Sequence, residues 1–475
     1  MKGKEKMLKR MISALLLAAL ALAMLAGCGS EDGMEEGGGQ SGTEKNLVVA
    51  ANAGEDSLDP VYSYGSWYGV RYGVYETLFR LDESMTPQPW LAESCRNIDQ
   101  YTWEIVIKEG ITFSNGAALT AQKVLESLDY ERQNNEMMAD ILKTAEMTAE
   151  GQTLTIVCQT PAPALIHNLC DPFCAVIDVA ADTDFNTNPI GTGPFVVEEF
   201  QAKSLCRLRA NEDYWDGPSP LDTVEIRVIS ETGTLATALR SGEIDAVIQG
   251  ATADSVDQLE GDADYGTDIC ATSRVFLLML NQNNEHLRNP TFRRALARAI
   301  DRGALCNDML EGSAIPGAGT FPAELPYGDV SITGLEYDLE QARALLAQAG
   351  YVLEGERLTR DGEAVTLRIV TSTMRQELQL LAQGVASQLE QLGIETEIIT
   401  SADDVRTVLA ADEFDIGVYS RVAAATGDPY DMLASCYGTD GYANYGHYTS
   451  GQVDEMLSQL AAEFRILGNY KGYEG

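Results

Sequence analysis

Short segments in which every second residue is apolar recur through the first half of the chain. Trp103, Ile105 and Ile107 alternate with polar residues, and a period of two is typical of a strand with one buried face. The same alternation occurs at Leu154, Ile156 and Cys158 and at Val224, Ile226 and Val228, and a short apolar run occupies 47–50. The pattern predicts mixed sheet with few long helices in this half.

The second half of the chain changes to helical spacing. Apolar residues fall on one helix face at Phe292, Ala295, Leu296, Ala299 and Ile300. A second face runs through Ala342, Leu345, Leu346 and Ala349, with Gly350 where a glycine commonly follows a helix end. We therefore expect two helices: one that begins near residue 291 and a second that ends near residue 349.

The segment 365–398 predicts a strand, a helix and a second strand. Apolar residues alternate at 365–369 and 394–398, and a helix face runs from Leu378 to Leu392. A crossover of this length joins parallel strands. Thr373 and Gln376 are expected to form a capping box at the start of the helix. Backbone N–H groups of its first turn would then face the carboxyl edge of the sheet, where open α/β sheets bind ligands.

The N-terminal segment has the features of an export signal. Basic residues up to Arg10 precede an apolar run that starts at Met11 and ends before Leu25-Ala26-Gly27-Cys28. The run is roughly 16 residues, which suits a signal peptide and is short of the ~20 needed to span a bilayer. The last four residues resemble the bacterial lipobox, which implies removal of residues 1–27 and lipidation of Cys28. A plain signal peptide with an unrelated cysteine is the alternative. The acidic, glycine-rich residues 28–45 are expected to be a tether.

Composition narrows the class of protein. A length of 475 residues with 45% hydrophobic content predicts two or three domains. The formal net charge of -39 repels nucleic acid, so no nucleic-acid partner is expected. The chain has three histidines, which argues against a His-rich metal site, and we predict no metal and no cofactor. Cys170 and Cys174 are a close pair that forms either a small disulfide loop or two buried thiols.

Seven sequence blocks occur in order in the first half. They are Leu58-Asp59-Pro60, Tyr75-Glu76-Thr77-Leu78, Pro89-Trp90-Leu91-Ala92-Glu93-Ser94, Phe113-Ser114-Asn115-Gly116, Pro189-Ile190-Gly191-Thr192-Gly193-Pro194-Phe195, Asn211-Glu212-Asp213-Tyr214-Trp215 and Gly242-Glu243-Ile244-Asp245. With Arg293-Arg294-Ala295-Leu296, Leu392-Gly393-Ile394, Asp428-Pro429 and Asn444-Tyr445, the set resembles the extracytoplasmic solute-binding proteins of ABC importers, family 5, the peptide and nickel class.

Two of these blocks also predict turns. In the block 191–194, we expect glycine to permit a positive φ in a tight turn that the following proline ends. Residues 114–116 are expected to form a hairpin-type turn before a helix.

The resemblance implies an α/β, two-lobed periplasmic-binding-protein-like fold of class II, with mixed sheets and a central ligand cleft. Lobe I with an inserted subdomain would occupy 46–270 and lobe II 271–457, and the tail 458–475 matches nothing in the family. Relatives continue beyond this point, so we expect a C-terminally truncated copy. Closure of the two lobes around a solute would be a rigid-body rotation.

The resemblance also implies a function. The protein would be an extracytoplasmic, lipid-anchored and monomeric receptor that delivers a small solute to ABC permease and ATPase subunits. A short peptide is the leading candidate. The alternatives are a nickel or other metal chelate, and a sensory or surface-hydrolase lipoprotein. No Gly-x-Ser-x-Gly or His-Glu-x-x-His motif occurs, and we expect no enzymatic activity.

Candidate ligand contacts begin with the aromatic segment Tyr64, Ser66, Trp67 and Tyr68, a loop that lines the cleft in relatives. Aromatic faces with hydroxyl tips suit a solute of mixed polarity. The alternative is an aromatic cluster that closes the core of the first lobe.

Polar candidates lie in the second half: Arg375, Arg421, Asp428 and His447. Ordinary surface solvation is the alternative explanation for each. Peptide-binding relatives carry an acidic anchor where this chain has Ala425. Nickel-binding relatives use two arginines and a tryptophan, which map to Asn134, to the segment 170–174 and to a position near Ala423. The anchors of neither ligand class are therefore present at the matching positions.

Overall fold

The computed structural model describes residues 44–259, 261–268, 270–328, 336–373 and 375–462. The expected signal peptide, the lipidated Cys28, nearly all of the tether and residues 463–475 of the tail lie outside this part of the chain. Within it, no helix combines the length and the apolar character that crossing a bilayer requires.

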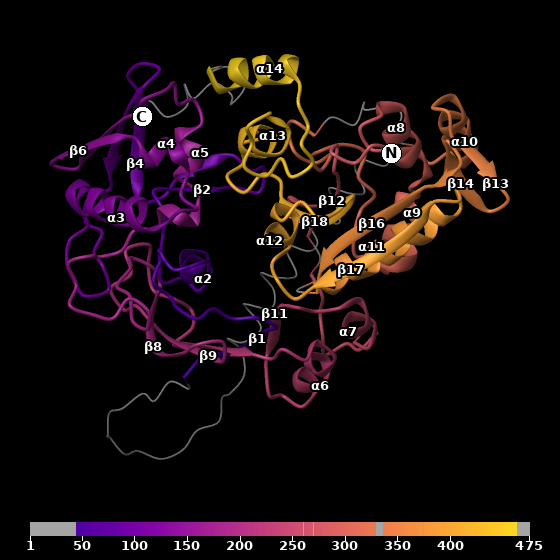
Figure 1. Ribbon diagram of the computed structural model, residues 1–475. Coiled ribbons are helices and arrows are strands. Elements are labelled where there is room, and N and C mark those ends of the chain that lie inside the picture. The colour runs from indigo at the N-terminus through magenta and orange to yellow at the C-terminus, as the bar shows by residue number, and fades with distance from the viewer. Residues whose placement is uncertain (1–43, 260, 269, 329–335, 374, 463–475) are drawn as a thin grey trace, which may run out of the picture. The chain divides into compact units, whose positions relative to one another are not determined.

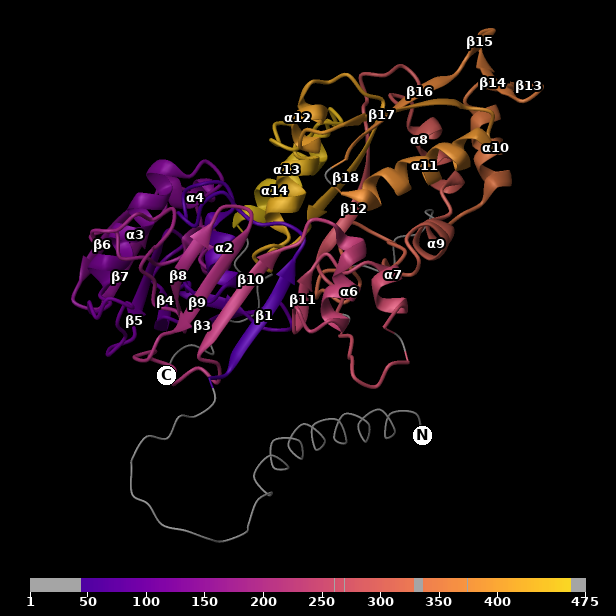
Figure 2. The same cartoon turned by 90° about the horizontal axis from the view of Figure 1, so that it is seen from below.

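A five-stranded mixed sheet forms the base of the first half. Its strand order is β11-β1-β10-β9-β8, with bounds β1 (Asn46–Ala51), β8 (Phe195–Gln201), β9 (Leu205–Ala210), β10 (Thr223–Val228) and β11 (Ala246–Gln249). β1 pairs in parallel with both β10 and β11, whereas β8, β9 and β10 pair antiparallel. Figure 2 shows β8, β9, β10 and β1 side by side, with α6 (Leu235–Arg240) beside β11. The prediction of mixed sheet in this half is confirmed.

A second, antiparallel sheet belongs to the same half. Its order is β4-β5-β7-β6, with bounds β4 (Ala92–Asn97), β5 (Thr102–Ile107), β6 (Glu146–Glu150) and β7 (Thr153–Val157). Helix α3 (Ala121–Asn134) packs on β6 and β7 because Val124 and Leu128 on one of its faces are fully buried. Trp103, Ile105 and Ile107 join the same core, as their alternation predicts. We call these two sheets and their helices lobe I.

The remaining elements of lobe I are short. They are α2 (Gly65–Arg71), the hairpin β2 (Phe79–Leu81) and β3 (Pro87–Pro89), α4 (Asp140–Lys143), α5 (Leu165–Asn168), the 3₁₀ turns η1 (Pro172–Cys174) and η2 (Thr232–Thr234), and α7 (Ala253–Asp257).

A four-stranded sheet of order β12-β18-β16-β17 organises the second half, which we call lobe II. Its strands are β12 (Arg274–Leu280), β16 (Thr366–Ser372), β17 (Glu395–Ser401) and β18 (Ile416–Val422). β16 pairs in parallel with β17 and β18, and β12 runs antiparallel to β18. Helix α11 (Gln376–Glu390) crosses between β16 and β17 and lies along both (Figure 1). The predicted strand, helix and strand are confirmed.

Further elements complete lobe II. They are α8 (Pro290–Ala299), α9 (Arg302–Ala304), the π-helical turn η3 (Leu305–Met309), α10 (Leu339–Gln348), the small sheet β13 (Val352–Glu354), β14 (Arg357–Arg360) and β15 (Glu363–Ala364), α12 (Val405–Ala410), α13 (Tyr430–Tyr437) and α14 (Gly451–Ala462). The helices expected near 291 and 349 are α8 and α10, and Gly350 has a φ of 88° after the latter.

The expected lobe boundary at 270 and 271 falls between the last strand of lobe I, β11, and the first strand of lobe II, β12. Its exact position stays a prediction. The described residues from Lys45 to Ala462 belong to one compact unit, within which the two lobes contact each other, for example where His167 donates to the carbonyl oxygen of Thr426. Helix α14 continues to Ala462, so the first residues of the expected tail are helical.

Three local predictions need correction. Helix α11 begins at Gln376 with Arg375 as its N-cap and has no side-chain cap, so the capping box of Thr373 and Gln376 is wrong. The segment expected to be a loop at Tyr64 is the start of α2. The positive φ expected for the glycines of the 191–194 turn is also wrong, because neither Gly191 nor Gly193 has a positive φ.

The two glycines of the 191–194 turn are required by space instead. A Cβ on Gly191 would lie 2.0 Å from the carbonyl oxygen of Val74, and one on Gly193 would lie 2.1 Å from that of Gly73. In the other predicted turn, Gly116 has a φ of 82° and its N–H bonds Phe113, as expected for a hairpin-type turn. Cys170 and Cys174 are both buried free thiols, which decides between the two readings of that pair.

The sequence blocks of lobe I converge on one carboxylate. Glu76 is 7% exposed and accepts four side-chain hydrogen bonds: from Trp90 Nε1 at 2.8 Å, Thr192 Oγ1 at 2.8 Å, Tyr214 Oη at 2.7 Å and Trp215 Nε1 at 2.9 Å. The donors come from three strand connections, because Tyr214 and Trp215 both lie between β9 and β10. This carboxylate therefore joins segments that are far apart in the sequence. Because a buried carboxylate needs hydrogen-bond donors, Glu76 stabilises the positions of the segments that carry its four donors.

Two other carboxyl groups of lobe I are poorly solvated and accept fewer hydrogen bonds than Glu76. Glu131 on α3 is fully buried, and neither carboxyl oxygen has a hydrogen-bond partner among the described residues. Burial and the charges of Asp171 and Asp59 raise its pKa well above the usual range. Burial also raises the pKa of Asp171 to about 6, against the Phe173 N–H that it accepts. The charge of Asp431 adds to the increase.

Replacing Glu76 tests its role as the joint of lobe I. We expect Glu76→Ala to lower the free energy of unfolding by about 3–5 kcal/mol, because one buried donor and three half-buried donors lose their acceptor. The matched control is Glu104→Ala, which removes an exposed pair with Arg96 and should cost less than about 1 kcal/mol. Urea denaturation of both variants checks this, and equal small losses would contradict it.

Asp171→Asn tests the poorly solvated carboxylate. A raised folded-state pKa means that Asp171 destabilises the fold once it ionises, so the wild type loses stability as the pH rises toward about 6. At pH 7 we expect the Asn variant to be more stable than wild type by about 1–2 kcal/mol, and at pH 5 by clearly less. Denaturation midpoints at the two pH values measure this difference. A variant that is less stable at pH 7 would refute the stated cause.

Candidate functional site

Helix α2 presents aromatic side chains on one face and small residues on the other. Gly65, Ser66 and Gly69 are buried, and a Cβ on Gly65 would lie 2.2 Å from the carbonyl oxygen of Asp59. Tyr64 is 37% exposed. Close packing of the small face therefore directs the aromatic side chains outward. Ser66 is fully buried, so it is not placed to contact a solute.

The aromatic face of α2 rests on η1. The Phe173 ring lies 6.0 Å from that of Tyr64 and 6.1 Å from that of Trp67, centroid to centroid. Tyr68 stacks edge-on with Tyr72 at 5.7 Å. The segment thus matches both of its interpretations in part. Ser66 and Tyr72 lie in the core of lobe I, whereas Tyr64, Trp67 and Tyr68 keep exposed surface that a solute could contact.

Two arginines of lobe II face this aromatic surface. Arg274 begins β12 and donates to Ser420 Oγ at 3.0 Å. Arg375, exposed, is the N-cap of α11. Burial and the positive charge of Arg375 lower the pKa of Arg274, and Tyr64 of lobe I and Glu377 act in the opposite direction. The two guanidinium groups thus lie within electrostatic range of each other and of Tyr64.

Arg406 and Tyr419 extend the same surface. Arg406 donates to Asp404 at 2.9 Å, and this bond raises its pKa against the effect of burial, with contributions from Tyr64 and Tyr419. Burial and Glu55 raise the pKa of Tyr68, and Arg375 opposes them. We call this set the arginine–tyrosine cluster: Tyr64, Tyr68, Arg274, Arg375, Arg406 and Tyr419.

The cluster is suited to an anion. Among the described residues, Arg274 and Arg375 form no salt bridge, whereas Arg406 pairs with Asp404. A carboxylate placed between the two arginines would relieve their mutual repulsion and accept two or more charge-assisted hydrogen bonds. The first turn of the 15-residue α11 adds backbone N–H groups of the same preference. Nearby tyrosine hydroxyls would supply neutral hydrogen bonds and aromatic contact.

Arg421 lies beside this cluster, but its guanidinium is already committed. It donates to Asp431 Oδ2 at 2.6 Å and to Tyr442 Oη at 2.8 Å, and 11% of its side chain is exposed. Arg421 therefore orders the neighbouring α13, and Asp431 would have to be displaced before it could bind a solute.

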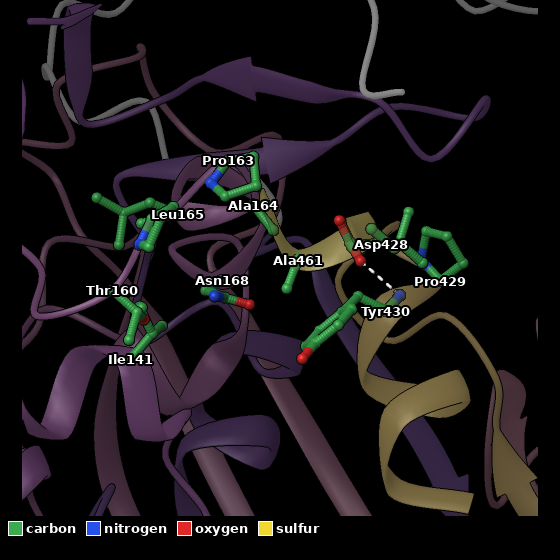
Figure 3. Close-up of a pocket in the computed structure, with 13 residues that line it drawn as sticks. Ile141, Thr160, Pro163, Ala164, Leu165, Asn168, Asp428, Pro429, Tyr430 and Ala461 are labelled. Atoms are coloured by element: carbon green, nitrogen blue, oxygen red, sulfur yellow. Dashed lines mark hydrogen bonds between the residues drawn. The ribbon is translucent and has the colours of Figure 1, made fainter. Parts of the chain in front are cut away.

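Asp428 lies in a different place, at a contact between the lobes. It is 6% exposed and accepts the N–H of Tyr430 at 2.6 Å (Figure 3). Burial raises its pKa and lowers that of the neighbouring His167. Among the described residues, neither Asp428 nor His167 forms a hydrogen bond or salt bridge with an arginine of the cluster.

Asp428 also lines a cavity of ≈ 130 Å³ between α5 and α13. Figure 3 shows Asn168 and Tyr430 on its opposite walls, with Pro163, Leu165 and Ala461 among the other lining residues. Ligand pockets usually measure about 300–1,000 Å³. The cavity is therefore too small for the expected solutes, and the arginine–tyrosine cluster is the better candidate site.

His447 is placed on another part of lobe II. Its Nε2 lies 2.8 Å from Asp412 Oδ1, and the same oxygen accepts a hydrogen bond from Asn281 Nδ2. The imidazole is thus engaged in a polar network outside the cluster. The part of the chain that the structure describes contains no group of three or more His, Cys, Asp or Glu residues that could hold a metal ion.

Sequence reasoning missed Arg274, Arg406 and Tyr419. A topological signal exists for Arg274: β12 runs antiparallel to β18, so its first residue pairs with Val422 at the carboxyl end of that strand. Arg274 therefore reaches the same sheet edge as the start of α11, where open α/β sheets bind ligands. Since strand order cannot be read from local alternation, the pattern alone could not place Arg274 next to Arg375.

Comparison with known proteins fits this arrangement. Residues 86–444 match the model of the family "Bacterial extracellular solute-binding proteins, family 5 Middle". Among curated proteins, the chain is 29% identical over 442 residues to the nickel-binding protein NikA of Staphylococcus aureus, covering 93% of this chain and 85% of that protein. It is 25% identical to the oligopeptide-binding protein AppA of Bacillus subtilis, covering 96% and 88%.

Solved structures agree. The crystal structure of a nickel ABC transporter protein from Bacillus halodurans has 30% identity and a TM-score of 0.73, covering 89% of this chain and 88% of that one. NikA of Staphylococcus aureus, crystallised with Ni(L-His)2, has 27% identity and a TM-score of 0.72 over the same shares. The class II α/β fold with mixed sheets is confirmed. The chain belongs to family 5 of the bacterial extracellular solute-binding proteins and is the non-enzymatic substrate-binding protein of an ABC importer.

Proposed function

We propose that this protein captures a small metal chelate whose organic ligands carry carboxylates, with nickel held by histidine as the model solute. The single observation that supports this most is that Arg274 and Arg375 meet at one sheet edge, where the charge of Arg375 lowers the pKa of Arg274. The solute would lie between the aromatic face of α2 and these arginines. Its carboxylates would bind the guanidinium groups, and its organic rings would contact Tyr64 and Tyr68.

Electrostatics favours a chelate over a bare metal ion. Two guanidinium groups that form no salt bridge among the described residues repel a free divalent cation at the distance of a bound solute. A chelate brings its own nitrogen and oxygen donors to the metal and presents carboxylates outward. The metal is cargo in this scheme, and the protein recognises the ligands around it.

The relatives support the same choice. NikA of Staphylococcus aureus is named for nickel binding and was crystallised with Ni(L-His)2, which carries two carboxylates. AppA of Bacillus subtilis is named for oligopeptides. Peptide-binding relatives hold the α-amino group with an acidic residue, and the matching position here is Ala425. The anchors of nickel-binding relatives are also absent, at Asn134 and in the segment 170–174, so the choice rests on Arg274 and Arg375 and on the similarity to NikA. We therefore favour the chelate over the short peptide that the sequence blocks alone put first.

Location and delivery belong to the same proposal. Removal of residues 1–27 and lipidation of Cys28 would hold the protein on the outer face of the cell membrane, with residues 28–45 as a tether. The monomeric protein would present its closed lobes, 46–270 and 271–457, to permease and ATPase subunits. The family membership supports this role, in which closure signals that a solute is bound.

Calorimetric titration tests the class of solute. We expect the purified protein to bind Ni²⁺ mixed with L-histidine, and to give no comparable heat with Ni²⁺ alone, L-histidine alone or a panel of di- to pentapeptides. The reason is that only the chelate combines two carboxylates with a shape that both lobes can contact. Tight binding of a peptide, or of Ni²⁺ without histidine, would contradict the proposal.

Arg375→Ala tests the carboxylate contact. Since Arg375 is exposed, its loss should leave the fold intact but weaken chelate binding by about 10- to 100-fold, which corresponds to one charged hydrogen-bond pair. The matched control is Arg357→Ala, an exposed lobe II arginine that pairs with Glu395 and should leave the affinity unchanged. Equal affinities for the two variants would show that Arg375 makes no contact with the solute.

A further inference from the structure

The loop at residues 426–428 of lobe II contacts lobe I directly. This contact lies outside the arginine–tyrosine cluster. His167, at α5 of lobe I, is 4% exposed, and its Nδ1 donates to the backbone carbonyl of Thr426 at 2.7 Å. Because a carbonyl oxygen can only accept, the bond fixes the proton on Nδ1. Residues 259 positions apart are thus joined across the two lobes.

The next residue fits the same contact only as glycine. Gly427 has a φ of 75° and is buried. A Cβ at this position would lie 2.2 Å from the carbonyl oxygen of Met85, 3.1 Å from Leu81 Cδ2 and 3.2 Å from His167 Nδ1. All three atoms belong to lobe I. The loop therefore lies too close to lobe I for any side chain at position 427.

Both docking surfaces are held in place from their own lobes. In lobe I, Met85 occupies the β2–β3 turn with a φ of 61°, and the Asp82 carboxylate accepts the N–H groups of Ser84 and Thr86 around it. In lobe II, Tyr327 Oη donates to the carbonyl oxygen of Gly427 at 3.1 Å.

The segment that follows the loop is also fixed. Asp428 accepts the N–H of Tyr430 at the start of α13. Two preformed surfaces that match at backbone distance gain contact without losing much conformational freedom.

We propose that residues 426–428 form a latch that holds the two lobes together independently of any solute. Opening the lobes breaks the His167 bond and separates Gly427 from Met85. The latch therefore shifts the balance between open and closed forms before a solute arrives. Since a solute binds between closed lobes, a larger closed population raises its apparent affinity by the same factor. This inference rests on the two-lobe fold and not on the identity of the solute.

Two kinds of variant break the latch. Gly427→Ala inserts a methyl group against the Met85 carbonyl. His167→Leu keeps the packing volume but removes the donor to Thr426. His167→Asn is the rescue variant, because its Nδ2 occupies about the place of His Nδ1. His167→Gln is the matched control, because its amide reaches the place of Nε2 instead.

Small-angle X-ray scattering of the full chain without solute is the direct test. We expect Gly427→Ala, His167→Leu and His167→Gln to give a larger radius of gyration than wild type, and His167→Asn to match wild type. Denaturation midpoints of each variant show whether the lobes remain folded. If Gly427→Ala does not fold, the three His167 variants carry the test alone.

A titration with Ni²⁺ and L-histidine adds a second readout. The opened variants should bind this probe about five- to tenfold more weakly, the equivalent of one buried hydrogen bond. The scattering experiment tests the latch without any solute, so its result holds even if Ni²⁺ and L-histidine do not bind. Identical scattering of wild type and all variants would overturn the inference, as would rescue by glutamine in place of asparagine.

Discussion

The proposed function depends on two arginines at one sheet edge that form no salt bridge with any described residue. The chain carries a net charge of -39, yet Arg274 and Arg375 lie close enough for one to lower the pKa of the other. Neighbouring arginines are each given a carboxylate, Arg406 by Asp404 and Arg421 by Asp431. A protein with so many acidic residues could neutralise the remaining pair, so the pair is best understood as a place kept for an anionic solute.

A rigid scaffold keeps these charges in position. In lobe I, the four donors of Glu76 hold distant connections around one carboxylate, and Gly65 of α2 packs against the backbone of Asp59. In lobe II, the parallel pairing of β16 with β17 and β18 sets the edge at which α11 begins. Functional side chains on rigid elements lose little entropy on binding. The 426–428 loop then connects the two rigid bodies at a separate point.

Local patterns predicted the elements well where burial decides them. The alternation at Trp103 and the helix face at Leu378 both match strands and helices of the structure, because a buried face leaves a period in the sequence. The start of α11 was misplaced, since Arg375 and not Thr373 precedes it. The sequence predicted glycine at 191 and 193 for the wrong reason. The turn itself does not need glycine there; the backbone of Gly73 and Val74, far away in the sequence, lies too close to leave room for a side chain.

The site was less predictable than the fold for a related reason. Arg375 and the aromatic segment were found through resemblance to the family, but the side chains around them come from strands whose order is set by tertiary pairing. Arg274 looks like an ordinary residue at the start of a strand until β12 is placed antiparallel to β18. His447 and Asp428 were reasonable polar candidates that proved to have structural partners, Asp412 and the Tyr430 N–H.

A crystal of the protein grown with Ni²⁺ and L-histidine, measured at the nickel absorption edge, tests the central claim most directly. We expect one strong anomalous peak between α2 and the N-terminus of α11, with carboxylate density on the guanidinium groups of Arg274 and Arg375. A peak on protein histidines elsewhere, or density for a peptide with no metal at this position, would contradict it.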